Sequence, residues 1–129
     1  MKASATSSEC PCGSGLCYAS CCKPLHQGHL ATTAEALMRS RYSAYMLRLE
    51  PYLLATWHPD TRPDTLDLSQ DNMKWLGLKV IRAETTSPTT AIVEFIARYK
   101  IGGMRAERLH EISEFVYTDA WYYVVGKTD

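Results

Sequence analysis

Apolar residues recur with two different periods along this chain, first every three to four residues and then every second residue. The first pattern is that of one face of a helix. It is formed by Ala34, Leu37, Met38, Tyr42, Tyr45, Met46 and Leu49. Thr32 and Glu35 have the spacing of a capping box, so we expect the helix to begin there. A second helix is predicted from Pro51 and should end at His58-Pro59, because the residue before a proline is pushed out of helical geometry.

The second half of the chain alternates apolar and polar residues, which predicts β-strands. The predicted strands cover 75–86, 90–101, 106–118 and 121–126. Turn residues separate them at Ser87-Pro88, Gly102-Gly103 and Asp119-Ala120. Helices followed by an antiparallel meander predict an α+β domain over 30–129. Residues 1–29 are interpreted as a flexible tail followed by a cysteine-rich segment that has no core of its own.

Composition narrows the class of protein. The 129 residues are 46% hydrophobic, and 14 basic side chains balance 14 acidic ones. A chain of this length can form one compact domain, and no apolar run reaches the roughly 20 residues of a membrane-spanning helix. The first residues, MKASATSSE, lack the apolar core of a secretory signal, so we expect a cytoplasmic protein without membrane contact. The balanced charge argues against nonspecific binding of nucleic acid.

All five cysteines fall in the stretch CPCGSGLCYASCC at residues 10–22. In a reducing cytoplasm, clustered thiols more often bind a metal than form disulfides. Cys10, Cys12, Cys21 and Cys22 supply the four thiolates of a tetrahedral zinc site with no position left for water. The sequence therefore predicts one structural zinc ion.

Small and polar residues around these cysteines suit the same role. Gly13 and Gly15 permit positive φ angles, which would turn backbone N–H groups toward the sulfurs. The Ser14 hydroxyl and the Lys23 ammonium are expected to offset the negative charge of the thiolates.

Several alternatives compete with this assignment. Cys17 is a fifth thiol that we interpret as a small packed or exposed residue, and His26 or His29 could replace Cys22 as a ligand. An iron–sulfur cluster is less favoured because adjacent cysteines suit its geometry poorly. A redox bridge between Cys21 and Cys22 is also less favoured, because the cluster contains no C-x-x-C pair.

The cysteine stretch resembles the SEC-C motif, in which C-x-C is followed eight residues later by a cysteine next to a cysteine or histidine. The whole chain resembles the YchJ family of bacterial proteins that carry this motif. The matching segments are ALMRSRYSAY at 36–45, TWHP at 56–59 and LHEISEF at 109–115. The resemblance implies a cone-shaped, curved antiparallel sheet with helices across one face, which is the nuclear-transport-factor-two-like or cystatin-like fold. It also implies a zinc-dependent docking surface for an unidentified protein partner, and it brings no established reaction.

Folds of this kind often hold a pocket between sheet and helices. Our candidate pocket residues are Arg41, Trp57, His58, His110 and Glu114, drawn from a wider polar set that adds Arg39, Tyr42, Tyr45 and Glu111. A histidine with a carboxylate could move a proton near neutral pH. Strand alternation places His110 and Glu114 on one face of the sheet and Glu111 on the other.

Three functional hypotheses follow. The first is a non-enzymatic protein-interaction or adaptor module held together by zinc. The second is a small-molecule-binding or acid–base enzyme domain that uses the pocket. The third and weakest is ribosome or RNA association through the basic hairpin of Arg98, Lys100, Arg105 and Arg108. We interpret these cations mainly as protection of exposed strand edges against pairing.

Overall fold

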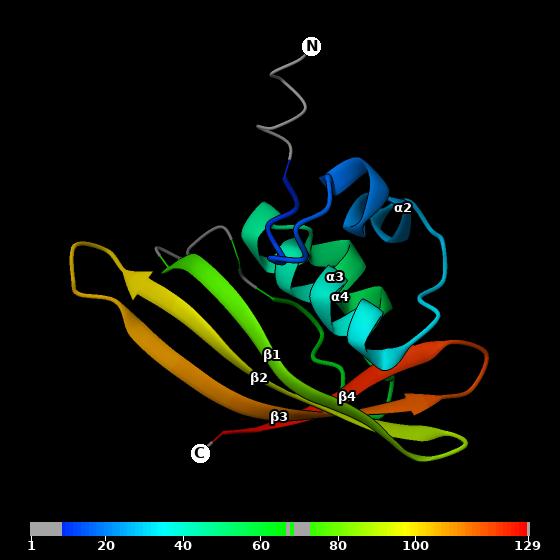
Figure 1. Ribbon diagram of the computed structural model, residues 1–129. Helices are drawn as coiled ribbons and strands as arrows, with labels where there is room; N and C mark the ends of the chain where they lie inside the picture. The colour runs from blue at the N-terminus through cyan, green and yellow to red at the C-terminus, as the bar shows by residue number, and fades with distance from the viewer. Residues whose placement is uncertain (1–8, 67, 69–72, 129) are drawn as a thin grey trace.

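The computed structural model describes residues 9–66, 68 and 73–128, and it has the predicted α+β organisation (Figure 1). Residues 1–8 of the predicted tail, which we expected over 1–9, lie outside the described residues, and so do residues 67 and 69–72 of the connection before the sheet. The short helical elements of the cysteine segment are η1 (Tyr18–Ser20) and α2 (Cys22–His26). The longer helices are α3 (Ala34–Leu47) and α4 (Glu50–Ala55). The strands are β1 (Met73–Ser87), β2 (Thr90–Ile101), β3 (Glu107–Tyr117) and β4 (Trp121–Thr128).

Helix α3 begins one residue later than the capping box predicts. The Thr33 hydroxyl oxygen accepts a hydrogen bond from the backbone N–H of Ala36 at 3.0 Å. Thr33 is therefore the N-cap, in place of Thr32. Glu35 forms an ion pair at 3.0 Å with Arg39, one turn further along the helix.

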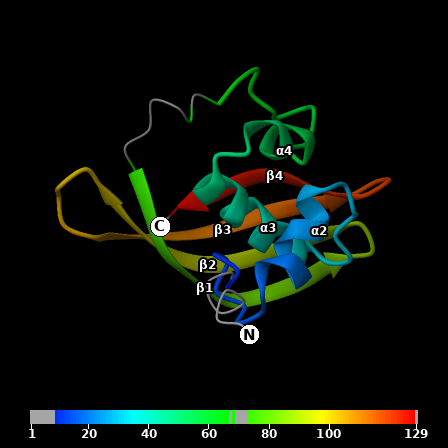
Figure 2. The same cartoon turned by 90° about the horizontal axis from the view of Figure 1, so that it is seen from above.

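The four strands form one antiparallel sheet in the order β1-β2-β3-β4. The sheet is strongly curved, and helices α2, α3 and α4 lie across its concave side (Figures 1 and 2). This arrangement confirms the curved antiparallel sheet that the family resemblance implied. The predicted strand bounds agree with the observed ones to within two residues, and burial alternates most regularly along β2. The pairing of β1 with β2 is interrupted by three register shifts.

The core lies between α3 and the concave face of the sheet. Alternate residues of β2 are buried there, namely Ala91, Val93, Phe95 and Ala97. Leu37, Met38 and Tyr42 of α3 pack into the same cluster, and so do Cys10, Cys12 and Cys22. The cysteine segment is thus packed into the core of the domain.

Candidate functional site

Four cysteine sulfurs converge beside the middle of α3, next to Arg39 and Ser43. The Sγ atoms of Cys10, Cys12, Cys21 and Cys22 all lie within 4.8 Å of one another, and three of these residues are buried while Cys21 is half-buried. Sγ of Cys21 lies 3.6 Å from that of Cys12 and 3.9 Å from that of Cys22. A zinc–sulfur distance of about 2.3 Å gives a tetrahedron with edges of about 3.8 Å. The four cysteines could therefore hold a metal ion.

The loop between the two cysteine pairs adopts the conformation that its glycines permit. Gly13 has φ 79° and Gly15 has φ 87°, both in the left-handed region that favours glycine. Ser14 Oγ lies 3.2 Å from Cys21 Sγ. The prediction of a hydroxyl next to the sulfurs is therefore confirmed.

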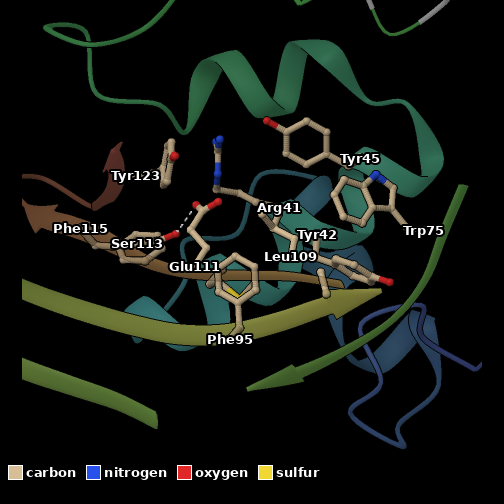
Figure 3. Close-up of a pocket in the computed structure, with 12 residues that line it drawn as sticks. Arg41, Tyr42, Tyr45, Trp75, Phe95, Leu109, Glu111, Ser113, Phe115 and Tyr123 are labelled. Atoms are coloured by element: carbon tan, nitrogen blue, oxygen red, sulfur yellow. Dashed lines mark hydrogen bonds between the residues drawn. The ribbon is translucent and has the colours of Figure 1, made fainter. Parts of the chain in front are cut away.

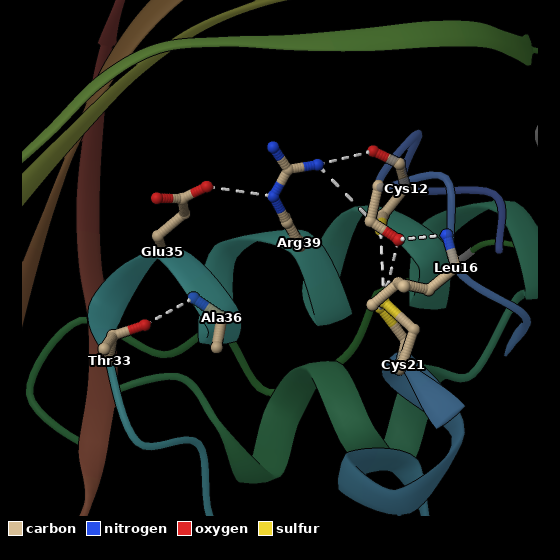
Figure 4. Close-up of polar contacts among 9 residues, drawn as sticks. Cys12, Leu16, Cys21, Thr33, Glu35, Ala36 and Arg39 are labelled. Carbon is tan, nitrogen blue, oxygen red and sulfur yellow. Dashed lines mark hydrogen bonds and ion pairs between the residues drawn. The ribbon is translucent and has the colours of Figure 1, made fainter. Parts of the chain in front are cut away.

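The cation beside the sulfurs comes from α3. Arg39 Nη1 donates to the backbone oxygen of Cys12 at 2.9 Å and lies 4.0 Å from Cys12 Sγ (Figure 4). Lys23, the cation that we expected here, is exposed on α2. Arg39 also pairs with Glu35. Its guanidinium is therefore held, from the helix side, over the loop between the two cysteine pairs (residues 13–20, the cysteine loop).

A buried serine of α3 also contacts the sulfurs. Ser43 Oγ donates to Cys22 Sγ at 3.3 Å and lies 3.7 Å from Cys10 Sγ. Sequence reasoning missed Ser43, although a serine between the apolar positions of Tyr42 and Tyr45 was a signal that a polar partner faces it. Ser43 and Arg39 together make α3 one wall of the candidate metal site.

The thiols have unequal proton affinities. The hydrogen bond from Cys22 lowers the pKa of Cys12 to about 4. The same contact and burial raise the pKa of Cys22. One thiol of the pair therefore loses its proton readily, whereas deprotonating the next requires a positive charge nearby, which a bound metal ion supplies.

The other possible ligands lie outside the four-sulfur group. Cys17 is exposed. His26 Nε2 is 2.8 Å from the backbone oxygen of Ser40, and its Nδ1 is 2.7 Å from the Tyr18 hydroxyl. A carbonyl oxygen only accepts, so Nε2 donates and Nδ1 accepts from Tyr18. Both ring nitrogens are thus engaged, and His29 is exposed.

A cavity of about 250 Å³ lies between α3 and the concave face of the sheet (Figure 3). Aromatic and aliphatic side chains form most of its wall, with a small polar group among them. The lining residues are Met38, Arg41, Tyr42, Tyr45, Trp75, Phe95, Ala97, Leu109, Glu111, Ser113, Phe115 and Tyr123.

Arg41 supplies the positive charge of the cavity. Only 5% of its surface is exposed. Its Nη1 donates to the backbone oxygen of Leu53 at 2.8 Å and to Thr56 Oγ1 at 2.7 Å. The guanidinium carbon lies 4.4 Å from the ring centroid of Tyr123 and 5.0 Å from that of Trp57. Burial lowers the pKa of Arg41, but an arginine still keeps its proton in proteins.

Glu111 of β3 supplies the negative charge. Its Oε2 accepts a hydrogen bond from Ser113 Oγ at 3.0 Å, as Figure 3 shows. Within the described chain, no carboxylate oxygen lies within 4.0 Å of an Arg41 nitrogen. Burial raises the pKa of Tyr42 and that of Tyr123 to about 12. These two tyrosines therefore keep their hydroxyl protons at neutral pH.

Of the five candidate pocket residues, only Arg41 lines this cavity. The Trp57 indole packs edge-on against Tyr123 at a centroid distance of 4.9 Å, behind the cavity wall. The backbone N–H of His58 donates to the backbone oxygen of Tyr123 at 2.8 Å. The His58 ring packs edge-on against Tyr122, 6.2 Å away between centroids, so it lies outside the lining.

His110 and Glu114 lie on the opposite face of β3 from the cavity. His110 Nε2 is 2.6 Å from Glu94 Oε2, and Glu114 forms an ion pair with Lys127 at 2.9 Å. The strand register explains this placement, because Leu109 pairs with the buried Ala97 and the residues of its parity face α3. Glu111, which the sequence had assigned to the other face from His110, is the carboxylate that reaches the cavity.

None of the helices in the described part of the chain is long and apolar enough to cross a membrane.

Comparisons with known proteins agree over most of the chain. A UPF0225 protein of Chromobacterium violaceum is 55% identical over 123 residues, which cover 91% of this chain and 90% of the relative. A UPF0225 protein of Ralstonia nicotianae is 49% identical over 139 residues, covering 98% and 95% respectively. The solution structure of a SEC-C motif containing protein from Rhodopseudomonas palustris has a TM-score of 0.82 at 36% identity, covering 93% of this chain and 98% of that one.

The family model described as "YchJ, middle NTF2-like domain" matches residues 33–126, which begin at the N-cap of α3 and end within β4. The curved sheet and the helices across it are the fold of that domain, and the four cysteines precede it. On these grounds the chain belongs to the YchJ family.

Proposed function

We propose that this chain is a cytoplasmic, non-enzymatic zinc protein that acts by binding other molecules. The observation that carries the proposal is the convergence of Cys10, Cys12, Cys21 and Cys22 within 4.8 Å, in a core shared with α3. Four sulfurs complete a tetrahedral shell and leave no position for water. The zinc ion would therefore hold the cysteine segment on the domain, and it would not activate a nucleophile.

Metal analysis of protein purified under reducing conditions tests this proposal. We expect about one zinc ion per chain, which a Cys21→Ser variant should lose together with part of its thermal stability. Cys17→Ser is the matched control, because Cys17 lies outside the four-sulfur group. A folded wild-type protein with less than about a tenth of a zinc ion per chain would contradict the proposal.

The proposed partner is a protein that docks on the cysteine loop. Leu16 lies in this loop with 54% of its surface exposed, on a segment that metal binding would make rigid. An apolar side chain on a rigid loop loses little conformational freedom on binding, which favours affinity. The likeness to SEC-C tails, which serve as zinc-dependent docking surfaces, supports the same role.

Affinity capture from cell extract with three proteins tests the docking role. A partner that wild type retains should be lost with Leu16→Asp. Met104→Asp is the control, since Met104 is 68% exposed and belongs to the connection between β2 and β3. Figure 1 shows that this hairpin lies away from the cysteine segment. Identical partner sets for Leu16→Asp and wild type would argue against docking on this loop.

The cavity supports a second candidate function, the binding of a small molecule. A largely apolar hollow with a few placed polar groups is typical of ligand sites. None of the residues that line it is a histidine, which favours binding over acid–base chemistry. Fragment binding followed by NMR tests this function. Leu109→Trp should fill the cavity and abolish binding, whereas Leu109→Met should retain it.

A further inference from the structure

The cavity beneath α3 carries two opposite charges on different elements of the fold. Arg41 extends into it from the helix, and Glu111 extends into it from β3 (Figure 3). The two side chains are not joined as an ion pair, because no carboxylate of the described chain lies within 4.0 Å of an Arg41 nitrogen. Each charged group therefore has hydrogen-bonding capacity left for a third group in the cavity.

The remaining capacity can be assigned to donors and acceptors. Arg41 uses Nη1 for the Leu53 oxygen and the Thr56 hydroxyl, and its side chain also interacts with that of Tyr45. A guanidinium carries three N–H donors besides the two on Nη1, so donors remain after the contact with Tyr45. Glu111 accepts from Ser113 through Oε2, and its carboxylate has further lone pairs. A ligand in this cavity would thus meet N–H donors on the α3 side and a carboxylate acceptor on the β3 side.

The net charge of the lining favours an uncharged ligand. Arg41 and Glu111 contribute one charge of each sign, and no other lining residue is ionised at neutral pH. An anion or a cation would add an uncompensated charge to a mostly apolar hollow, which is unfavourable. A neutral molecule that both accepts and donates hydrogen bonds satisfies both charged groups at no such cost.

The shape of the lining favours a flat ligand. Aromatic rings of α3, β1, β2, β3 and β4 face the hollow, among them Tyr42, Trp75, Phe95, Phe115 and Tyr123. Aromatic walls bind planar molecules through offset stacked and edge-to-face contacts. A volume of about 250 Å³ limits the ligand to one or two rings.

We propose that the cavity binds a small, flat, uncharged lactam heterocycle, whose carbonyl oxygen accepts from Arg41 while the adjacent ring N–H donates to Glu111. This inference rests on the second candidate function above and specifies the class of ligand. It involves no covalent step.

The test uses the zinc-loaded full chain and four probes followed by NMR titration. The probes are isoquinolin-1(2H)-one, its N-methyl analogue, benzoate and benzylamine. We expect the lactam to shift the amide signals of β3 around Glu111. The N-methyl analogue should bind roughly tenfold more weakly, because it leaves the carboxylate without a donor. Benzoate and benzylamine should bind more weakly still.

A pair of matched variants assigns the effect to Glu111. Glu111→Leu should bind the lactam and its N-methyl analogue equally well. Glu114→Leu is the same substitution on the outer face of the same strand, and it should keep the discrimination. If Glu111→Leu does not fold, the comparison of the two lactams on the wild-type protein still tests whether the ring N–H contributes to binding.

The outcomes separate the ligand class from the function. Equal binding of both lactams by wild type, or preferential binding of benzoate or benzylamine, overturns the lactam inference while leaving a small-molecule site in place. If none of the four probes binds the folded protein, the inference fails. A broader fragment set that also leaves the cavity signals unshifted would overturn the small-molecule function as well.

Discussion

Gly126 of β4 is the position where a single methyl group should disturb the cavity. A Cβ added there would overlap Oε2 and Cδ of Glu111 and would lie 3.0 Å from the Tyr123 hydroxyl oxygen. The Glu111 carboxylate sits at the flexible end of its side chain, so Gly126→Ala should push it aside. The hydrogen bond that Ser113 donates to it would then be lost.

The size of the effect follows from two opposing contributions. Losing a hydrogen bond to a charged acceptor lowers the free energy of unfolding by about 1.5–3 kcal/mol. Replacing glycine with alanine within a strand raises it by about 0.5–1 kcal/mol. We expect Gly126→Ala to lower the free energy of unfolding by about 1–2 kcal/mol and Tm by roughly 5 °C. Gly77→Ala is the control, because a Cβ at Gly77 would meet no atom within 4 Å.

Thermal and urea unfolding followed by circular dichroism measure the difference. Gly77→Ala should be as stable as wild type or slightly more stable. In a Glu111→Ala background, Gly126→Ala should no longer destabilise, because the atoms that the methyl group would displace are gone. The reasoning is refuted if Gly126→Ala matches Gly77→Ala, or if its effect persists in the Glu111→Ala background.

Three further changes test other parts of the structure. Thr33→Ala removes the bond to the Ala36 N–H and should cost about 1 kcal/mol in urea unfolding; no change would mean that α3 needs no N-cap. Ser43→Ala removes the hydroxyl that donates to the Cys22 sulfur and should weaken zinc binding roughly tenfold in a chelator competition, so an unchanged affinity would speak against its role. Burial lowers the pKa of His26 below its ordinary value of 6.5. Just below pH 6.5 the unfolded chain therefore binds a proton at His26 more strongly than the folded protein does. The contribution of His26 to the free energy of unfolding should be complete above pH 6.5 and should fall as the pH drops below it. A His26→Gln variant whose free energy of unfolding falls with pH as steeply as that of wild type would contradict this.

Features that depend on neighbouring residues were predictable from the sequence. The strands were found because apolar and polar residues alternate locally, most regularly in β2, and turn residues separate the strands. The four-sulfur group was found because its members are close in the chain. The start of α3 was misplaced by one residue because Thr32 and Thr33 are both good N-caps and only the backbone geometry distinguishes them. Arg39 was not linked to the sulfurs because it approaches Cys12 across a separation of 27 residues.

The cavity was harder to predict because the two faces of β3 look alike. One face carries Leu109, Glu111, Ser113 and Phe115, and the other carries His110, Ile112, Glu114 and Val116. Each set has two apolar and two polar residues, so hydrophobicity alone does not decide which face is inside. Pairing with β2 decides it, because Ser113 lies opposite the fully buried Val93. That pairing joins residues that are distant in the sequence, so it cannot be predicted from local patterns.

The cysteine segment is unsuited to use as a portable cassette. Cys10, Cys12 and Cys22 pack in the same core as Leu37 and Val93. The cysteine segment and the domain formed by α3 and the sheet therefore bury apolar surface of each other. A truncated protein that starts at residue 33 would expose the apolar flank of α3 to water and should aggregate. The segment grafted onto a foreign carrier would lack the guanidinium and hydroxyl that α3 provides, so fusion proteins made from this chain should retain residues 9–128 as one piece.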